Sequence, residues 1–99
     1  MRLPKISQYP KELKIRDEHY KILFRKRVIV DGESVLGACD PDKKIIYILK
    51  TQSQSEIFKT LVHEILHGFE EEYNKEFGHT KIKILEDAIL RFISDNFSG

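Results

Sequence analysis

Two histidines separated by three residues set the tightest limit on what this chain can fold into. They stand in the stretch His63-Glu64-Ile65-Leu66-His67. On an α-helix, residues four apart lie one turn above each other on one face. Two imidazole nitrogens so placed can bind one Zn²⁺ at about 2.0–2.1 Å. The glutamate between them would lie near the open metal position, where it can take a proton from water. The pattern therefore predicts a helix that presents a zinc site.

The sequence around the histidines predicts a helix with two unlike halves. Ser53 and Glu56 form a capping-box pattern that marks its start. Apolar residues then recur at helical spacing on one half of the wheel: Ile57, Phe58, Leu61, Val62, Ile65, Leu66 and Phe69. His63 and His67 fall on the other half, and Glu64 lies at the border. The histidines are therefore not core residues, and either a metal site or a solvated histidine pair fits the wheel.

A second helix, predicted over residues 80–97, carries a carboxylate on its apolar side. Its apolar stripe consists of Ile82, Leu85, Ile89, Leu90, Phe92, Ile93 and Phe97. Glu86 falls in the middle of this stripe, whereas Asp87 falls outside it. Burying a carboxylate is costly unless it is paired or binds a metal. We expect Glu86 to be either a third ligand beside His63 and His67 or the partner of a Lys or Arg, and we favour the ligand. Such a set leaves the fourth zinc position for water.

The first half of the chain predicts short strands joined by tight turns. The strands are expected over residues 12–16, 20–25, 28–30, 35–39 and 45–49. The first of them suits the edge of a sheet. Asp31-Gly32 predicts a hairpin turn, because glycine accepts positive φ, and Asp40-Pro41 predicts a second turn. Residues 1–10 contain two prolines and no periodicity, so we expect an irregular arm.

Composition limits the classes of partner. The chain has 99 residues, which suits a single domain over residues 1–99, and a net charge of +1. This balance gives no electrostatic argument for nucleic acid or an anionic membrane as a partner. The basic cluster Arg25-Lys26-Arg27 lacks interleaved aromatic residues and is more typical of a solvated face than of a phosphate site. Without a signal pattern or an apolar run long enough to span a bilayer, we expect a cytoplasmic protein.

Four further residues are candidates for the site. His79 is an alternative third ligand, but it lies near a turn marked by Gly78. His79 and Tyr73 are both candidates for stabilising the oxyanion of a tetrahedral intermediate. Cys39 is the only cysteine; it is expected to be a packed thiol, with a thiolate zinc ligand as the alternative. Glu70 begins an acidic tail, residues 70–73, which we expect to be solvated although Glu70 could lie near the histidines.

The chain resembles the gluzincins, metallopeptidases in which a second helix supplies a glutamate as the third zinc ligand. The resemblance covers the whole chain and is closest to the minigluzincins and to small phage- and prophage-encoded H-E-x-x-H proteins. It rests on residues 44–67, with Lys-Lys-Ile-Ile-Tyr-Ile followed by Leu-Val-His-Glu-Ile-Leu-His, and on the stretch Glu86-Asp-Ala-Ile-Leu. Glu86 stands nineteen residues after His67, a separation that fits this group.

The resemblance implies an α+β fold in which a small antiparallel β-sheet is followed by an active-site helix and a glutamate helix. It also implies a zinc metallopeptidase with one Zn²⁺ per chain, held by His63, His67 and Glu86. Glu64 would be the general base, and the substrate would be a peptide or protein. The metzincin pattern is excluded, because it needs Gly and His where this chain has Glu70 and Tyr73.

A second class of function also fits the sequence. A non-catalytic, zinc-stabilised binding or regulatory module, for example a phage-related one, would have a fourth protein ligand such as Glu70, His79 or Cys39. Variants of the enzyme hypothesis are a latent form blocked by one of its own termini, a fold whose activity has lapsed, and a peptidase with one dedicated target such as a phage repressor. We expect a monomer or a weak homodimer.

Overall fold

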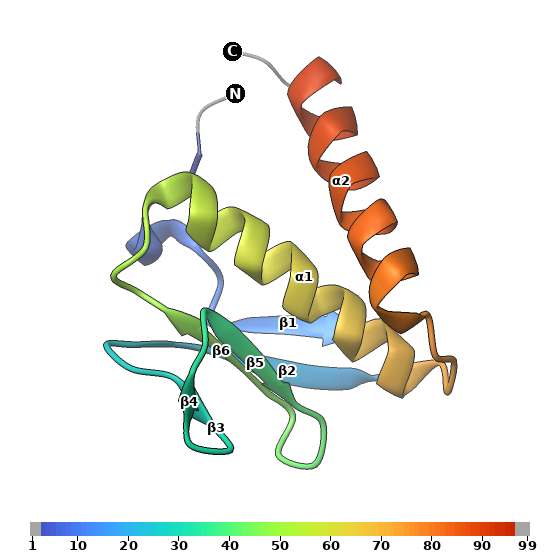
Figure 1. Ribbon diagram of the computed structural model, residues 1–99, viewed down its shortest axis with the longest axis horizontal. Coiled ribbons are helices and arrows are strands. Elements are labelled where there is room, and N and C mark those ends of the chain that lie inside the picture. Colours follow the sequence, from blue (N-terminus) through green and yellow to red (C-terminus); the bar gives the residue numbers. More distant parts are fainter. Residues whose placement is uncertain (1–2, 97–99) are drawn as a thin grey trace.

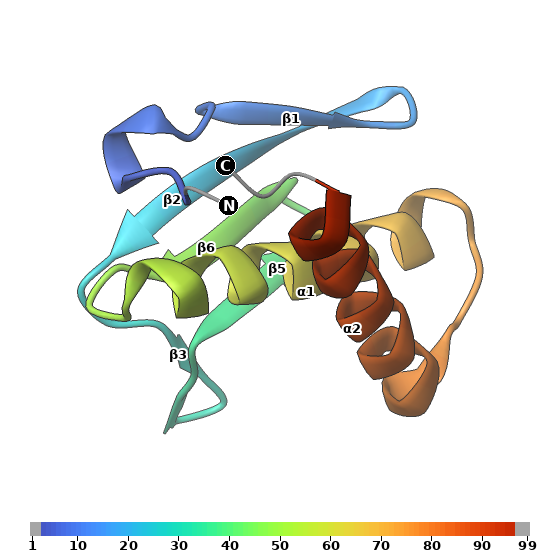
Figure 2. The ribbon, with the colours of Figure 1, turned by 90° about the horizontal axis from the view of Figure 1, so that it is seen from above.

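Helix α1 lies on one face of a four-stranded β-sheet, α2 packs on α1, and a separate β-hairpin projects on the other side of the sheet (Figure 1). This computed structural model describes the backbone of residues 3–96 and the side chains of residues 3–91. Seen from above, helix α1 lies across the sheet, and helix α2 crosses the C-terminal half of α1 (Figure 2). The arrangement confirms the expected α+β class and places the end of α1 between the sheet and α2.

The sheet is mixed, so the expectation of a purely antiparallel sheet is wrong. Its order is β1 (Glu12–Ile15), β2 (Glu18–Arg25), β6 (Ile45–Leu49) and β5 (Gly37–Asp40). The outer pairs are antiparallel, but β2 and β6 run parallel at the centre. The turn after β5 commits β6 to antiparallel pairing with β5, because Asp40 Oδ1 accepts the backbone N–H groups of Asp42 and Lys43. Strand β2 then takes the free side of β6.

The predicted turn at Asp31-Gly32 is confirmed, but it closes a smaller hairpin than expected. Asp31 and Gly32 have φ values of 52° and 81°, as a two-residue hairpin turn requires. The hairpin consists of β3 (Ile29–Val30) and β4 (Glu33–Ser34). The expected strand over residues 35–39 instead begins at Gly37 and pairs with β6. The tight turn pairs residues 29 and 30 with residues 33 and 34. The segment that begins at Gly37 is therefore available to pair with β6 in the main sheet.

Both predicted helices are present with slightly different limits. Helix α1 (Gln54–Glu72) begins after Ser53, whose Oγ accepts the N–H of Glu56 at 3.2 Å, so the expected N-cap is confirmed. Helix α2 (Gly78–Asn96) begins two residues before the expected residue 80. The side chains of Phe92 and Ile93, and all of Phe97, lie outside the described residues.

The N-terminal segment packs partly on the domain. Within the expected arm, residues 6–8 form a short 3₁₀-helix, η1 (Ile6–Gln8). Tyr9 is half-buried, and its ring centroid lies 5.7 Å from that of Phe24. The arm is therefore irregular in sequence pattern but joined to the hydrophobic core through one aromatic residue.

The core lies between the sheet and α1. Isoleucines and one tyrosine of the sheet face the apolar half of α1, and the fully packed set consists of Ile15, Tyr20, Ile22, Ile46, Ile48, Ile57 and Leu61. The alternation of these residues along β2 and β6 directs every second side chain to the helix. The core thus fixes which half of α1 faces the sheet.

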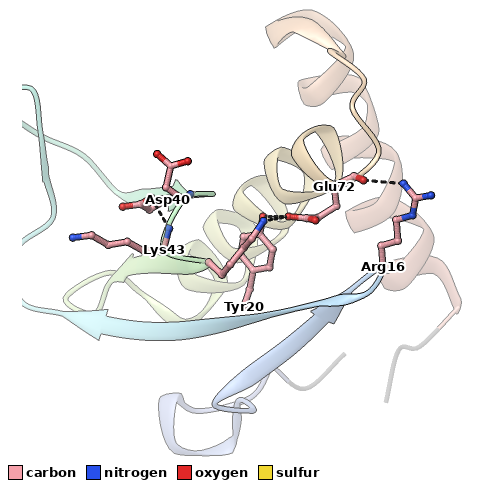
Figure 3. A network of polar contacts seen from close by, with 7 residues as sticks. Arg16, Tyr20, Asp40, Lys43 and Glu72 are labelled. Atoms are coloured by element: carbon pink, nitrogen blue, oxygen red, sulfur yellow. Dashed lines mark hydrogen bonds and ion pairs between the residues drawn. The ribbon is translucent and has the colours of Figure 1, made fainter.

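A polar cluster, here called the Glu72 cluster, anchors the C-terminal end of α1 to the sheet (Figure 3). The hydroxyl of Tyr20 donates to Glu72 Oε2 at 2.6 Å, and Lys44 Nζ lies 2.6 Å from the same oxygen. Arg16 donates to the backbone carbonyl of Glu72 at 3.0 Å. The Lys44 and Tyr20 hydrogen bonds hold the pKa of Glu72 below its usual range, whereas burial raises the pKa of Tyr20. The expectation of a solvated acidic tail is therefore wrong at Glu72.

Edge strand β5 approaches α1 closely because residue 37 has no side chain. A Cβ atom at Gly37 would come within 2.5 Å of Thr60 Cγ2 and 3.3 Å of Glu64 Cγ. The side chain of Gln52 stabilises the same contact: it accepts from Thr60 Oγ1 and donates to the carbonyls of residues 36 and 49. This edge of the sheet is therefore held directly beside Glu64.

Candidate metal centre

Helix α1 brings His63 and His67 together as the spacing predicts. The two rings meet edge to face with centroids 4.8 Å apart. Their Nε2 atoms face each other at 3.2 Å. Two nitrogen ligands bound to one tetrahedral Zn²⁺ lie roughly 3.3 Å apart, given bond lengths of about 2.0–2.1 Å. The histidine pair therefore has the separation that a shared zinc ion requires.

Each histidine is held by a carboxylate at its other ring nitrogen. Glu86 Oε2, from α2, lies 2.7 Å from Nδ1 of His63. Glu70 Oε1, from the last turn of α1, lies 2.6 Å from Nδ1 of His67. Carboxylate partners at the outer nitrogen are the usual means by which proteins orient metal-binding histidines. The outer contacts of the pair therefore also fit a metal site.

These contacts determine the tautomer of both rings. An ionised carboxylate can only accept hydrogen bonds, so both Nδ1 atoms carry hydrogens. Two neutral imidazoles in this state direct their Nε2 lone pairs at each other across 3.2 Å. Such an arrangement is repulsive unless a proton or a metal ion lies between the two nitrogens. The geometry of the pair thus creates a demand for a cation.

Glu86 is buried as the apolar stripe predicts, with 6% of its surface exposed. It contacts the outer nitrogen of His63 and not the point where the two Nε2 atoms meet. Among the residues whose side chains are described, no group of three or more His, Cys, Asp or Glu is arranged to hold a metal ion. The observed contact of Glu86 is that of an orienting partner, and its role as third ligand stays a prediction.

Glu64 occupies a position that suits a proton acceptor. It is buried, although it lies at the border of the helical wheel. Burial raises the pKa of Glu64 to about 7; the nearby His63 opposes this rise and Glu86 adds to it. The residue lines two cavities of about 420 and 380 Å³, of which the first also contacts His67 and the second His63. Glu64 therefore reaches open space on both sides of the histidine pair.

Glu70 lies beside the histidines, which confirms one of the two expectations for this residue, and not in a solvated tail. Both of its oxygens have protein partners: Oε1 contacts His67, and Oε2 accepts the backbone N–H of Phe77 at 2.8 Å. Burial alone would raise the pKa of Glu70, but the hydrogen bonds from Phe77 and His67 outweigh it and lower the pKa. The spacing of three residues from His67 was a usable signal, because such pairs meet on a helix. The contact with Phe77 had no signal in the sequence.

The other candidates lie at the margin of the site. His79 is exposed, and its ring centroid lies 6.4 Å from that of His67. Cys39 lines the larger cavity with Glu64 and His67, but burial raises its pKa to about 12, which disfavours a thiolate. Tyr73 packs its ring against Phe69, and Arg16 lies over it. The structure therefore brings His63, His67, Glu64, Glu70 and Glu86 together.

Comparison with protein-family models, curated proteins and solved structures found no match to this chain. Within the described residues, neither helix combines the length and apolar character needed to cross a membrane. The basic cluster Arg25-Lys26-Arg27 is exposed, as expected for a solvated face. The histidine pair is therefore the feature of the molecule that points to a function.

Proposed function

We propose that this protein is a zinc-dependent metallopeptidase that hydrolyses peptide bonds. The observation that carries the proposal is the pair of Nε2 atoms of His63 and His67, which face each other at 3.2 Å while carboxylates hold both outer nitrogens. One zinc ion per chain would be held by these two histidines, with Glu86 as third ligand once its carboxylate moves from the outer nitrogen of His63. We place the enzyme in the cytoplasm, where its single cysteine would stay reduced.

The chemistry divides between the metal and Glu64. Zinc, when bound, supplies a Lewis acid that polarises a peptide carbonyl and acidifies water. Glu64 takes the proton from the attacking water and later passes it to the leaving amine. Without metal, burial raises the pKa of Glu64 to about 7; the charge of a bound zinc ion would lower this pKa and favour the carboxylate that accepts the proton.

An extended peptide is the substrate form that the sheet supports. Strand β5 pairs with β6 on one side only, and no other strand among residues 3–96 pairs with its outer edge. A peptide added along a free edge would gain backbone hydrogen bonds. Because Gly37 in β5 packs directly against Glu64, such a peptide would pass beside the proposed base. The cavities on the two sides of Glu64 would receive side chains on either side of the cleaved bond.

Metal content measured by mass spectrometry tests the proposal first. Wild-type protein purified without chelator should contain about one zinc per chain, and His67→Ala should lose it. His79→Ala is the matched control, because this histidine is exposed and lies at the margin of the site. Absence of zinc from the wild type, even after zinc is added, would remove the basis for the enzyme.

The size of the loss in Glu86→Gln separates the two roles of Glu86. If the carboxylate ligates zinc, the variant should lose stoichiometric metal. If it only orients His63, affinity should fall by about 10–100-fold, as for other outer partners of metal-binding histidines. Zinc that binds with unchanged affinity would exclude both roles. Hydrolysis of a peptide library by the zinc-loaded wild type then distinguishes an enzyme from a zinc-stabilised module without catalysis.

A further inference from the structure

Glu70 connects the histidine pair to the turn that leads into α2. One of its oxygens contacts Nδ1 of His67 at 2.6 Å, and the other accepts the N–H of Phe77 at 2.8 Å. Phe77 immediately precedes α2, the helix that carries Glu86. Each carboxylate oxygen therefore has its own partner, and the two partners lie on opposite sides of the turn between the helices.

The position of Glu70 argues against a purely local role in the helix. It stands in the last turn of α1, where the carbonyl end of the helix dipole disfavours negative charge. Glu71 and Glu72 follow it, and this turn contains no basic residue. A carboxylate at this position lowers the stability of the helix unless other contacts offset the loss. The contacts with His67 and Phe77 provide that offset.

We propose that Glu70 is a positioning residue that fixes His67 in the Nδ1–H tautomer, so that the lone pair of Nε2 is directed at the zinc ion. The same residue fixes the turn that leads into α2. This inference rests on the proposed zinc site. It assigns to Glu70 no contact with metal or substrate; it acts through His67 alone.

Glu70→Gln inverts the hydrogen bond without changing the shape of the side chain. The N–H of Phe77 can only donate, so it fixes the glutamine with its carbonyl oxygen toward Phe77. The amide NH₂ then faces Nδ1 of His67, which must become an acceptor. The proton moves to Nε2, where it blocks metal binding. The Nε2–H group of His67 can then donate to Nε2 of His63, which lies 3.2 Å away. The two nitrogens therefore no longer repel each other in the absence of a cation.

The variant should therefore change two properties in opposite directions. Metal-free Glu70→Gln should unfold at a higher temperature than metal-free wild type, whereas its affinity for zinc should be lower by about 10–100-fold. The ¹⁵N signals of the His67 ring in metal-free protein should show Nδ1 protonated in wild type and unprotonated in the variant. Glu71→Gln is the matched control: it removes the same charge from an exposed neighbour and should change none of these properties.

Two results would overturn the inference. One is zinc affinity in Glu70→Gln equal to that of wild type; the other is an unchanged protonation state at Nδ1 of His67. Failure of the proposed function is distinguishable, because wild type would then bind no zinc while the ring signals still report on Glu70. Glu70→Ala provides a further check, since it removes both contacts and should also speed hydrogen exchange at the amide of Phe77.

Discussion

Two polar clusters involve the C-terminal half of α1. They differ in whether their own residues balance the charge and the hydrogen-bond acceptors of the cluster. In the Glu72 cluster, one carboxylate accepts hydrogen bonds from the hydroxyl of Tyr20 and from the ammonium group of Lys44. In the histidine cluster, which consists of His63, His67, Glu64, Glu70 and Glu86, three carboxylates surround two imidazoles whose Nε2 atoms face each other at 3.2 Å. Described side chains supply a cation to the first cluster, whereas none supplies one at the point where the Nε2 atoms meet.

The contacts of Glu72 stabilise the fold, whereas the contacts of the histidine pair orient the ligands of the proposed metal site. A carboxylate with a hydrogen-bonded cation needs nothing further, and loss of one partner costs stability. A cluster with excess acceptors is stabilised when a proton or a metal ion binds between them. The same helix therefore carries an internally satisfied anchor and, toward its middle, the proposed metal site.

The largest expected effect comes from changing Glu64 in the histidine cluster. Glu64→Gln should retain about one zinc per chain but lower the rate of peptide hydrolysis by roughly 10²–10⁴-fold, because the general base is lost. Turnover measured on zinc-loaded protein checks this. Glu33→Gln, in the exposed strand β4, is the matched control. Equal turnover in wild type and Glu64→Gln would show that Glu64 is not the base.

Zinc should stabilise the protein through one cluster only. At a zinc concentration 1,000 times Kd, the free energy of unfolding should rise by about 4 kcal/mol. The rise should vanish in His67→Ala and persist unchanged in Tyr20→Phe, which alters the Glu72 cluster. Thermal denaturation with and without zinc measures the difference. A rise that depends on Tyr20 would mean that the two clusters are not independent.

The two clusters should respond to pH in opposite ways. The pKa of Glu64 rises from 4.5 to about 7 on folding, so between these values the folded state binds more protons than the unfolded state. The free energy of unfolding should then fall by roughly 3 kcal/mol as pH rises through this window and stay level above it. The pKa of Glu72 is lowered on folding, so its contribution is lost as pH falls through the acidic range.

Urea denaturation of zinc-free protein at pH 5 and pH 8 measures the contribution of Glu64. Glu64→Gln should be closer to pH-independent over this interval than wild type, since the glutamine does not titrate. An identical pH dependence in the two proteins would contradict the assignment of the raised pKa to Glu64.

The smallest expected effect concerns the Glu72 cluster itself. Tyr20→Phe removes a buried hydrogen bond to a charged group and should lower the free energy of unfolding by about 2 kcal/mol, with zinc affinity unchanged. Tyr47→Phe is the control, because Tyr47 makes no hydrogen bond through its hydroxyl to any described residue. Chemical denaturation of both variants checks the expectation. Equal stability of Tyr20→Phe and wild type would remove Tyr20 from the anchor.

Local patterns in the sequence predicted local structure well. Ser53 as N-cap, the turn at Asp31-Gly32 and the strand Ile45–Leu49 all follow from interactions within a few residues. The parallel pairing of β2 with β6 could not be predicted in this way, because it joins residues such as Lys21 and Ile45 that are remote in sequence. Strand pairing at that separation is decided by which edges remain free.

The candidate site shows the same division. The spacing of His63 and His67 predicts their approach, and the apolar neighbours of Glu86 predict its burial. Which nitrogen of His63 Glu86 contacts depends on how α2 packs on α1, and helical wheels do not contain that information. The burial of Glu72 was missed for a similar reason, since its partner Tyr20 lies 52 residues earlier.

The parallel pairing at the centre of the sheet has a consequence for the order in which the site assembles. Strands β5 and β6 and helix α1 are consecutive in sequence, so their contacts close short loops, whereas β2 must wait for a long one to close. We expect the facing histidines to form with the first group and Glu86 to join them when α2 packs on α1 across the short loop from Glu72 to Gly78. Strand β2 should complete the sheet last. Refolding with zinc present from the start should then be faster than refolding without it. Metal capture would in that case be an early event in the life of the chain, preceding the completion of the sheet.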